Sequence, residues 1–169
     1  MDASRESGPA AMKNRTTVER KSDREVVVTR TVRGPVHLVF EAWTKADLFR
    51  RWWVPKSIGA SLLSCEMDVR VGGKYRLVFA HGESDTMAFF GRYLEVIPRS
   101  RIVWTNEEAG EGGAVTTVTF EEKDGQTLVV LTELYPSKEA LDLAAGSTDG
   151  MPETFDQLDE LLADLGAGA

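Results

Sequence analysis

The sequence predicts an α+β domain in which an antiparallel sheet packs against one long helix near the C-terminus. Strand-like segments follow one another between residues 62 and 135, and an amphipathic helical pattern follows at 152–165. Two short helical segments follow the first strand, and at most one further helical turn is expected, over residues 137–145. Strands and helices that are segregated along the chain are typical of α+β folds. We therefore expect a sheet of six to seven strands, with two short helices after the first strand.

The domain is expected to begin at residue 24. Residues 1–23 are polar and small and have no apolar periodicity, so we interpret them as a disordered leader. Residues 24–166 are expected to form a single domain. The segment 25–32 (EVVVTRTV) is rich in β-branched residues and is followed by Gly34 and Pro35, which favours a strand that ends in a turn.

Two short helices are predicted next. Thr44 and Asp47 have the spacing of a capping box, which would start the second helix and carry it to about Trp52. The first helix is indicated by an apolar stripe at helical spacing. The stripe consists of Val36, Val39, Phe40 and Trp43.

Six strands are predicted to follow. Residues 74–81 alternate between apolar and charged side chains, which is the pattern of a strand buried on one face. Asp124 and Gly125 favour the tight turn of a hairpin between the last two strands. The expected strands span residues 62–71, 74–81, 86–97, 101–106, 114–122 and 126–135.

The last predicted element is a helix over residues 152–165. Pro152 suits its first turn, and Gly166 ends it. One helix covers less area than six or seven strands expose, so we expect a curved sheet with an apolar gap beside the helix. Gaps of this kind commonly bind small molecules.

Composition excludes several classes of function. The chain has 169 residues, with 20 Lys and Arg against 27 Asp and Glu, and a formal net charge of −7. This charge argues against binding to nucleic acid and to anionic membranes. The single cysteine, Cys65, excludes an intrachain disulfide, which fits the cytoplasm. With only two histidines beside it, a structural zinc site is not expected, and we predict no cofactor. No apolar run is long enough to span a membrane.

Several segments, taken in order, resemble one family. They are residues 40–44 (FEAWT), 51–55 (RWWVP), 68–73 (DVRVGG), 91–98 (GRYLEVIP) and the pair Gly150 and Met151. This order resembles the START-like (SRPBCC) superfamily and, within it, the family named for the activator of the heat-shock-protein-90 ATPase. The resemblance covers about residues 25–165. It implies the helix-grip fold, in which a curved antiparallel sheet wraps around a long C-terminal helix and encloses a hydrophobic cavity.

The resemblance implies no single function. Relatives include lipid carriers, hormone receptors, polyketide cyclases and a co-chaperone domain, and a shared fold is a weak guide to function. We predict a binding protein for a small hydrophobic or aromatic ligand, without assigned catalytic or metal-binding residues. One alternative is a co-chaperone-like protein that binds a chaperone through an exposed apolar patch. A second is a cyclase- or hydrolase-type enzyme using the same cavity. A homodimer through an edge strand is also plausible from sequence.

The candidate ligand site is the implied cavity. Alternation along the strands assigns the strand residues of its wall, and the last helix is expected to contribute Met151, Phe155 and Leu158. Side chains two residues apart share one face of a strand unless a β-bulge shifts the register. The same side chains would serve equally well in a solid core. Trp53 joins the set because it lies beside a Pro- and Gly-containing loop. The residues are Trp53, Tyr75, Leu77, Phe79, His81, Met87, Phe89, Tyr93, Trp104, Phe120, Val129, Leu131, Glu133, Met151, Phe155 and Leu158.

Glu133 is the polar candidate in this set, because it interrupts an otherwise apolar strand. If its side chain faces the cavity, burial would raise its pKa and suit it to anchoring a ligand or to acid–base chemistry. The alternatives are an exposed glutamate at a strand end, or one paired with Arg76 or Arg92. An enzyme would require a partner for Glu133, and His81 is the one we name.

Overall fold

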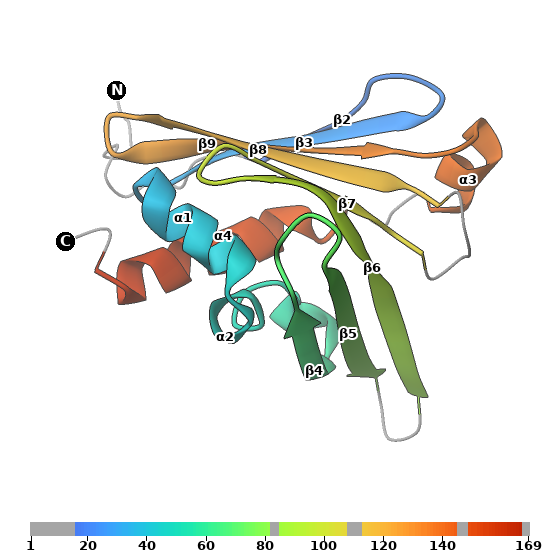
Figure 1. The fold of residues 1–169 in the computed structure, drawn as a ribbon, viewed down its shortest axis with the longest axis horizontal. Coiled ribbons are helices and arrows are strands. Elements are labelled where there is room, and N and C mark those ends of the chain that lie inside the picture. The colour runs from blue at the N-terminus through green and yellow to red at the C-terminus, as the bar shows by residue number, and fades with distance from the viewer. Residues whose placement is uncertain (1–15, 82–84, 108–112, 145–148, 167–169) are drawn as a thin grey trace, which may run out of the picture.

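One antiparallel sheet organises the domain, and the computed structural model describes residues 16–81, 85–107, 113–144 and 149–166. Helices α1, α2, α3 and α4 and the 3-10 turn η2 accompany the sheet (Figure 1). The strands are β2 (Thr17–Arg20), β3 (Glu25–Val32), β4 (Ala60–Met67), β5 (Lys74–His81), β6 (Asp85–Ile97), β7 (Arg101–Thr105), β8 (Val115–Lys123) and β9 (Gln126–Leu134). The helices are α1 (Val36–Thr44), α2 (Ala46–Phe49), η2 (Lys56–Ile58), α3 (Lys138–Leu143) and α4 (Met151–Asp164).

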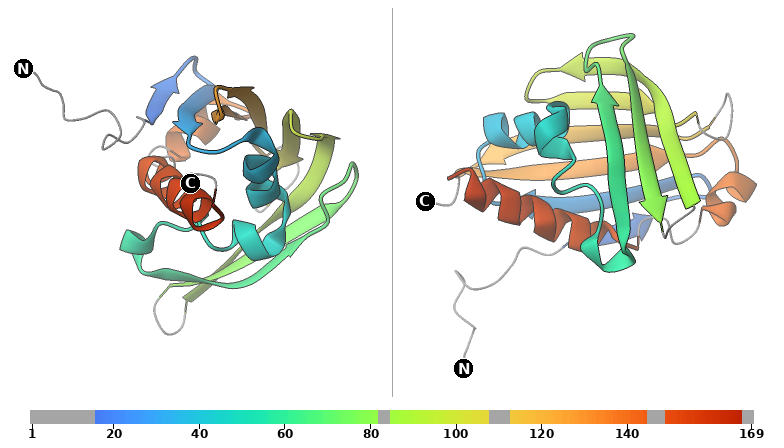
Figure 2. Two further views of the ribbon diagram at one scale, coloured as in Figure 1. Left: turned by 90° about the vertical axis from the view of Figure 1, so that its left-hand side faces the viewer. Right: turned by 90° about the horizontal axis from the view of Figure 1, so that it is seen from below.

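The sheet confirms the predicted fold class. Its strands are hydrogen-bonded in the order β2-β3-β9-β8-β7-β6-β5-β4, and every neighbouring pair is antiparallel. The sheet curves around α1 and α4, which lie on its concave side (Figure 2). This is the helix-grip arrangement, with eight described strands where six to seven were predicted. None of the described helices has the length and apolarity to cross a membrane.

The additional strand is β2, which falls within the predicted disordered leader. Thr17 pairs with Thr29, and Arg20 pairs with Val26 of β3. All four β2 residues are exposed, so the strand has no apolar face that a sequence pattern would reveal. Ordered structure therefore starts before the predicted boundary at residue 24. Residues 1–15 of the predicted leader lie outside the described residues.

The predicted capping box is wrong. The Thr44 hydroxyl donates a hydrogen bond of 2.8 Å back to the Phe40 carbonyl within α1. Helix α2 starts after Lys45 without a side-chain cap and ends at Phe49, short of the predicted Trp52. A threonine late in a helix can bond to the preceding turn, and here this bond replaces the cap.

The core is densely filled where α1 and α4 cover β3, β8 and β9; we call this part the covered half. Phe155, Leu158 and Leu162 of α4 are fully buried there, as are Val28 and Val32 of β3. Alternate residues of β3 are buried, as expected for a strand with one face on a core. Here the aliphatic side chains from the sheet and from α4 meet directly.

A buried ion-pair cluster fastens α4 to β3. Arg30, which is 2% exposed, lies on the buried face of its strand. Its Nη1 donates to Asp156 at 3.0 Å and to the Thr16 hydroxyl at 2.8 Å, and its Nη2 donates to Asp159 at 2.5 Å. Asp159 also accepts from the Arg33 backbone N–H at 2.8 Å. A buried guanidinium needs such compensation, so these carboxylates fix the position of α4.

Helix α4 also holds the segment that follows α2. The Gln157 amide donates to the carbonyls of Trp52 and Val54 at 2.9 and 2.8 Å. Its oxygen accepts from the Lys56 backbone N–H at 2.9 Å. These bonds satisfy backbone groups in a buried loop and set the position of Trp53, which lies between the two carbonyls in sequence.

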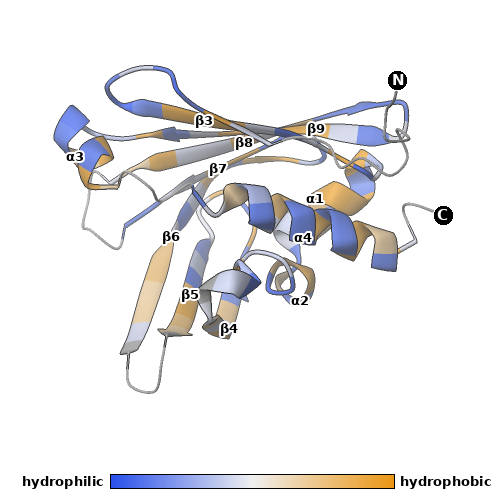
Figure 3. Cartoon of the chain, turned by 180° about the vertical axis from the view of Figure 1, so that it is seen from behind, coloured by the Kyte–Doolittle hydropathy of each residue, from blue (hydrophilic) through white to orange (hydrophobic). Residues whose placement is uncertain are grey.

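The strands β4, β5 and β6, together with the parts of β7, β8 and β9 nearest α3, form the open half of the domain. Figure 1 shows the far ends of β5 and β6 extending beyond the helices. Apolar residues nevertheless continue along both strands (Figure 3). The open half therefore has apolar surface on its concave side and less helix to cover it.

Candidate ligand-binding cavity

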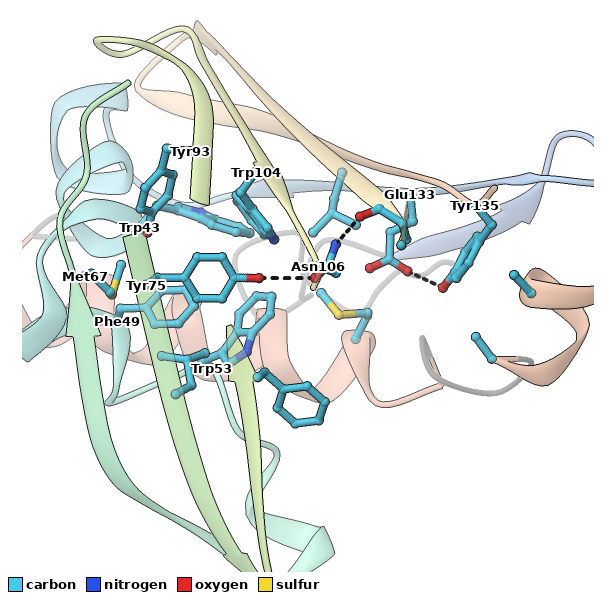
Figure 4. A pocket seen from close by; sticks show the side chains of 18 of the residues that line it. Trp43, Phe49, Trp53, Met67, Tyr75, Tyr93, Trp104, Asn106, Glu133 and Tyr135 are labelled. Atoms are coloured by element: carbon cyan, nitrogen blue, oxygen red, sulfur yellow. Dashed lines mark hydrogen bonds between the residues drawn. The ribbon is translucent and has the colours of Figure 1, made fainter. Parts of the chain in front are cut away.

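A cavity of about 720 Å³ lies on the concave side of the open half. Its described walls come from the sheet, from α1, from the segment around α2, from α3 and from the start of α4 (Figure 4). Sites for small organic molecules commonly have volumes of about 300–1,000 Å³. The cavity is therefore large enough for a small organic molecule.

One end of the cavity is aromatic. The Trp53 ring stacks on Phe49 with a centroid distance of 4.8 Å, and Trp43 meets Trp53 edge-on at 5.7 Å. Trp43 also lies 6.1 Å from Trp104. Three of the four tryptophans of the chain thus line the cavity. Fixed aromatic rings give large apolar contact areas at a low entropic cost, which suits a ligand wall.

Tyr75 and Asn106 form a polar band next to these rings. The Tyr75 hydroxyl donates to the Thr105 carbonyl at 2.7 Å and lies 3.4 Å from the Asn106 Oδ1. The Asn106 amide donates to the Ala114 carbonyl at 3.0 Å and to the Thr116 hydroxyl at 2.9 Å. Since both amide hydrogens are used, the side chain of Asn106 is held in one orientation.

Glu133 and Tyr135 lie beyond Asn106, near α3 (Figure 4). Glu133 comes from β9, where it pairs with Val26 of β3 and Thr116 of β8, and it lines the cavity. The Tyr135 hydroxyl donates to its Oε1 at 2.9 Å. Arg92, one of the two alternative partners, instead pairs with Glu107 at 3.1 Å.

Burial changes the acid–base behaviour of two groups on the β4 side. It raises the pKa of the Tyr93 hydroxyl, and the neighbouring Cys65 and Asp68 raise it further. Tyr93 therefore remains a neutral hydroxyl at physiological pH. Burial also raises the pKa of the Cys65 thiol, although Arg50 opposes this shift. A thiol with a raised pKa is a poor nucleophile, so Cys65 is no candidate for covalent catalysis.

Ten of the sixteen residues predicted for the wall do line the cavity. The parity rule succeeds on β5, which has no register shift against β6. That these residues bind a ligand remains a prediction. The ten are Trp53, Tyr75, Leu77, Phe79, Phe89, Tyr93, Trp104, Leu131, Glu133 and Met151.

Five other assigned residues lie elsewhere. Phe120 and Val129 have the predicted buried side but belong to the covered half, because alternation identifies a face of a strand and not the helix packed over it. Phe155 and Leu158 of α4 are buried as predicted, but in the covered half. Met87 is 54% exposed, since it lies where β6 extends beyond the helices. The side chain of the sixteenth, His81, lies outside what the structure describes, so its pairing with Glu133 stays untested.

Sequence reasoning missed part of the wall. Trp43 was predicted on the apolar stripe of the first helix and not on the cavity wall, but it contacts the core and the cavity together. Asn106 follows an apolar strand and ends it, and that abrupt change to an amide was a usable signal. The helical turn expected over residues 137–145 is α3, but its place on the wall was missed, because a six-residue helix has too few positions for a clear apolar stripe. The other missed residues include Phe49, Met67, Ala114, Tyr135, Pro136, Ala140, Leu143 and Ala144.

The cavity offers no recognisable metal centre. Within the described residues, no group of three or more His, Cys, Asp or Glu side chains is arranged to hold a metal ion. The Tyr135 hydroxyl is one of the partners of Glu133. The arrangement is therefore suited to holding a molecule by apolar contact and a few hydrogen bonds.

Comparison with known proteins gives the same fold. The family model described as "Activator of Hsp90 ATPase homolog 1-like protein" matches residues 33–163. No curated relative matches the chain. A crystal structure of a Rhodobacter sphaeroides protein is similar at 22% identity, with a TM-score of 0.81, and the match covers 89% of this chain and 99% of that one.

Two solution structures are also similar. A Staphylococcus epidermidis protein has 28% identity and a TM-score of 0.74, over 88% of this chain and 94% of that one. A protein from Aeromonas hydrophila described as AHSA1-like has 19% identity and a TM-score of 0.66, over 83% of this chain and 94% of that one. The fold around the cavity is therefore shared by these bacterial proteins.

Proposed function

Because the chain belongs to the family of Activator of Hsp90 ATPase homolog 1-like proteins, whose fold is compatible with ligand binding and with co-chaperone roles, we propose that it binds a small hydrophobic or aromatic molecule. The binding site is the cavity between the open half of the sheet and the helices. The observation that carries the proposal is the wall of this 720 Å³ space, which is aromatic at the end formed by α1, α2 and the segment after α2.

Apolar burial supplies the affinity. A ligand that removes about 300 Å² of apolar surface from water gains roughly 7 kcal/mol at 25 cal/mol per Å². Loss of ligand freedom reduces this gain. The stacked pair of Phe49 and Trp53 is already fixed by packing and by the Gln157 bonds, so little further ordering is needed.

Native mass spectrometry of the purified protein, with solvent extraction of bound material, tests the proposal directly. A stoichiometric adduct that is released on denaturation supports it. The binding of N-phenyl-1-naphthylamine, a neutral fluorescent aromatic probe, gives a second measurement. An apo mass, together with no probe binding, contradicts the proposal.

A pair of variants on α3 localises the binding. Ala140→Trp places an indole on the cavity wall, whereas Glu139→Trp adds the same group at an exposed position of the same helix. Ala140→Trp is expected to weaken probe binding at least several-fold, and Glu139→Trp to leave it unchanged. Equal effects of the two substitutions would place the probe outside the cavity.

The co-chaperone alternative requires a continuous apolar patch on the surface. Leu63, Phe90 and Leu94 are half-exposed on β4 and β6. In the register of these strands, however, Phe90 pairs with Arg76, and Lys74 pairs with Arg92. Charged side chains therefore interrupt the apolar ones on this face, which favours the cavity as the functional feature.

The proposal also includes a cellular location and an oligomeric state. We place the protein in the cytoplasm, as a single reduced cysteine suggests. A homodimer would form through β4 or β2, the two edge strands of the described sheet. Size-exclusion chromatography with light scattering tests this assembly, and a monomer across the micromolar range contradicts it.

A further inference from the structure

We propose that the cavity binds an apolar molecule that carries a hydrogen-bond acceptor, such as a ketone or amide carbonyl, and that the Trp104 indole N–H binds this acceptor. The inference rests on the proposed function and specifies the chemistry of its ligand. It follows from the hydrogen bonding of the tryptophan side chains, which differs between the core and the cavity wall.

An indole N–H is a hydrogen-bond donor only, and a buried one usually has an acceptor. Trp52 follows this rule, because it is fully buried in the core and its Nε1 donates to the Ala42 carbonyl at 3.0 Å. Trp43, Trp53 and Trp104 line the cavity, and we call them the wall tryptophans. Within the described residues, none of their indole nitrogens has an acceptor. The indole donors that lack a partner are therefore those on the cavity wall.

The wall tryptophans differ in the accessibility of their nitrogens. The Trp43 nitrogen is buried, and the Trp43 ring meets that of Trp53 edge-on at 5.7 Å. The Trp104 side chain is only partly buried. Figure 4 shows its nitrogen on the side of the ring that faces Tyr75 and Asn106, in the middle of the cavity. A ligand acceptor at this place therefore reaches the Trp104 N–H, whereas the Trp43 N–H is covered by its neighbours.

The sheet and the neighbouring rings hold Trp104 in position. Its strand β7 lies between β6 and β8, where Trp104 pairs with Tyr93 and with Thr116. Its ring lies 6.1 Å from Trp43 and meets Tyr75 edge-on at 6.5 Å. A donor that is already fixed loses little freedom when a ligand binds, so more of the hydrogen-bond energy contributes to affinity.

A hydrogen bond to Trp104 gives the cavity a preference that apolar contact alone lacks. A carbonyl that enters an apolar site gives up its hydrogen bonds to water, and this loss is costly unless a donor in the site replaces them. The Trp104 N–H is such a donor, and it lies among the rings that would hold the apolar body of the ligand. A carbonyl-bearing aromatic molecule therefore uses both features of the wall, whereas a hydrocarbon uses one.

Two ligands of the same shape test the inference: 2-acetylnaphthalene, and 2-isopropenylnaphthalene, in which a CH₂ group replaces the carbonyl oxygen. Displacement of N-phenyl-1-naphthylamine gives their dissociation constants for the natural sequence and for Trp104→Phe, which keeps an aromatic ring but lacks the N–H. We expect Trp104→Phe to weaken the ketone roughly threefold to tenfold more than the hydrocarbon. Each ligand is compared with itself, so the different hydration of the two ligands cancels.

Phe89→Leu is the control, because it changes the same wall without removing a donor. It should weaken the binding of both naphthalenes by similar factors. A Trp104→Phe protein that likewise weakens both ligands equally overturns the inference.

Nuclear magnetic resonance of the natural sequence needs no variant, so it tests the inference even if Trp104→Phe fails to fold. The four tryptophan indole N–H signals of the nitrogen-15-labelled protein are assigned by their nuclear Overhauser effects. We expect the Trp104 signal to lie further downfield with the ketone than with the hydrocarbon, and the Trp52 signal to be the same with both. A Trp104 signal that is the same with both bound ligands overturns the inference alone. If neither naphthalene nor N-phenyl-1-naphthylamine binds, the proposed function fails with it.

Discussion

The covered half and the open half belong to one sheet, yet they are filled in opposite ways. In the covered half, aliphatic side chains such as Val118, Val129 and Leu158 are fully buried in one core cluster. In the open half, large aromatic side chains surround a cavity of about 720 Å³. Ring-to-ring contacts, such as those of Trp53 with Trp43 and Phe49, hold the aromatic side chains in position. These side chains therefore form a stable wall without filling the space that they enclose.

The dimensions of the elements explain this difference. Eight strands at about 4.8 Å spacing span roughly 34 Å. Helix α4 has 14 residues and is about 21 Å long, and a helix is only about 10 Å wide. Helices α1 and α4 therefore cannot cover the whole concave face. The cavity therefore forms because the helices are too few and too short to cover the whole sheet, and aromatic side chains stabilise its wall.

The largest expected effect on stability comes from removing the ion pairs that join α4 to β3 in the covered half. Asp159→Ala removes the acceptor of both Arg30 and the Arg33 backbone N–H and leaves a buried guanidinium with less compensation. We expect the free energy of unfolding to fall by about 3–5 kcal/mol, measured by urea denaturation. Glu160→Ala, at an exposed position of the same helix, is the control. A loss below about 1 kcal/mol would mean that the ion pairs do not hold α4.

A leucine-to-alanine substitution made in each half tests whether the two halves are packed differently. Leu158→Ala in the covered half creates a new void and is expected to cost about 3–5 kcal/mol. Leu77→Ala, also buried but on the cavity wall, enlarges an existing space and is expected to cost about 1–2 kcal/mol. Chemical denaturation measures both. Equal losses would show that the two halves are packed alike.

Alkaline pH provides a third test, in the open half. Because the pKa of Tyr93 is higher in the folded protein than its ordinary value of 10, its contribution to stability is complete below pH 10 and is lost as the pH rises toward the folded-state pKa. The natural sequence should therefore lose about 1.4 kcal/mol between pH 8 and 11 that Tyr93→Phe does not lose. Parallel pH curves for the two proteins would contradict a buried hydroxyl.

The smallest expected effect concerns Met87, which is half-exposed although parity assigned it to the cavity wall. Met87→Ala should change the free energy of unfolding by less than about 0.5 kcal/mol and leave N-phenyl-1-naphthylamine binding unchanged. Phe89→Ala, two residues further along and on the wall, should weaken that binding several-fold. A clear effect of Met87→Ala on probe binding would extend the site to the end of β6.

Strand alternation was enough to predict most of the sheet and eight of the ten predicted residues that line the cavity; Trp53 and Met151 were predicted from a loop and a helix instead. It could not separate Phe120 from Tyr75, because both have the same parity and only the overlying helices distinguish core from cavity. Arg30 shows a second limit. In sequence it looks like a polar residue on an apolar strand, and its burial depends on carboxylates 126 and 129 residues later. The exposed strand β2 is invisible to hydrophobic patterning for a third reason, since it buries nothing.

The distance along the chain between Arg30 and its acidic partners has a consequence during protein synthesis. At about 5–20 residues per second, roughly 6–26 seconds separate the translation of β3 from that of α4. Throughout this interval the guanidinium has no carboxylate from α4, and the apolar face of β3 lacks the cover that α4 later provides. Closure of the covered half is therefore a late event on the ribosome, and the nascent sheet depends on its hairpins until the last helix emerges.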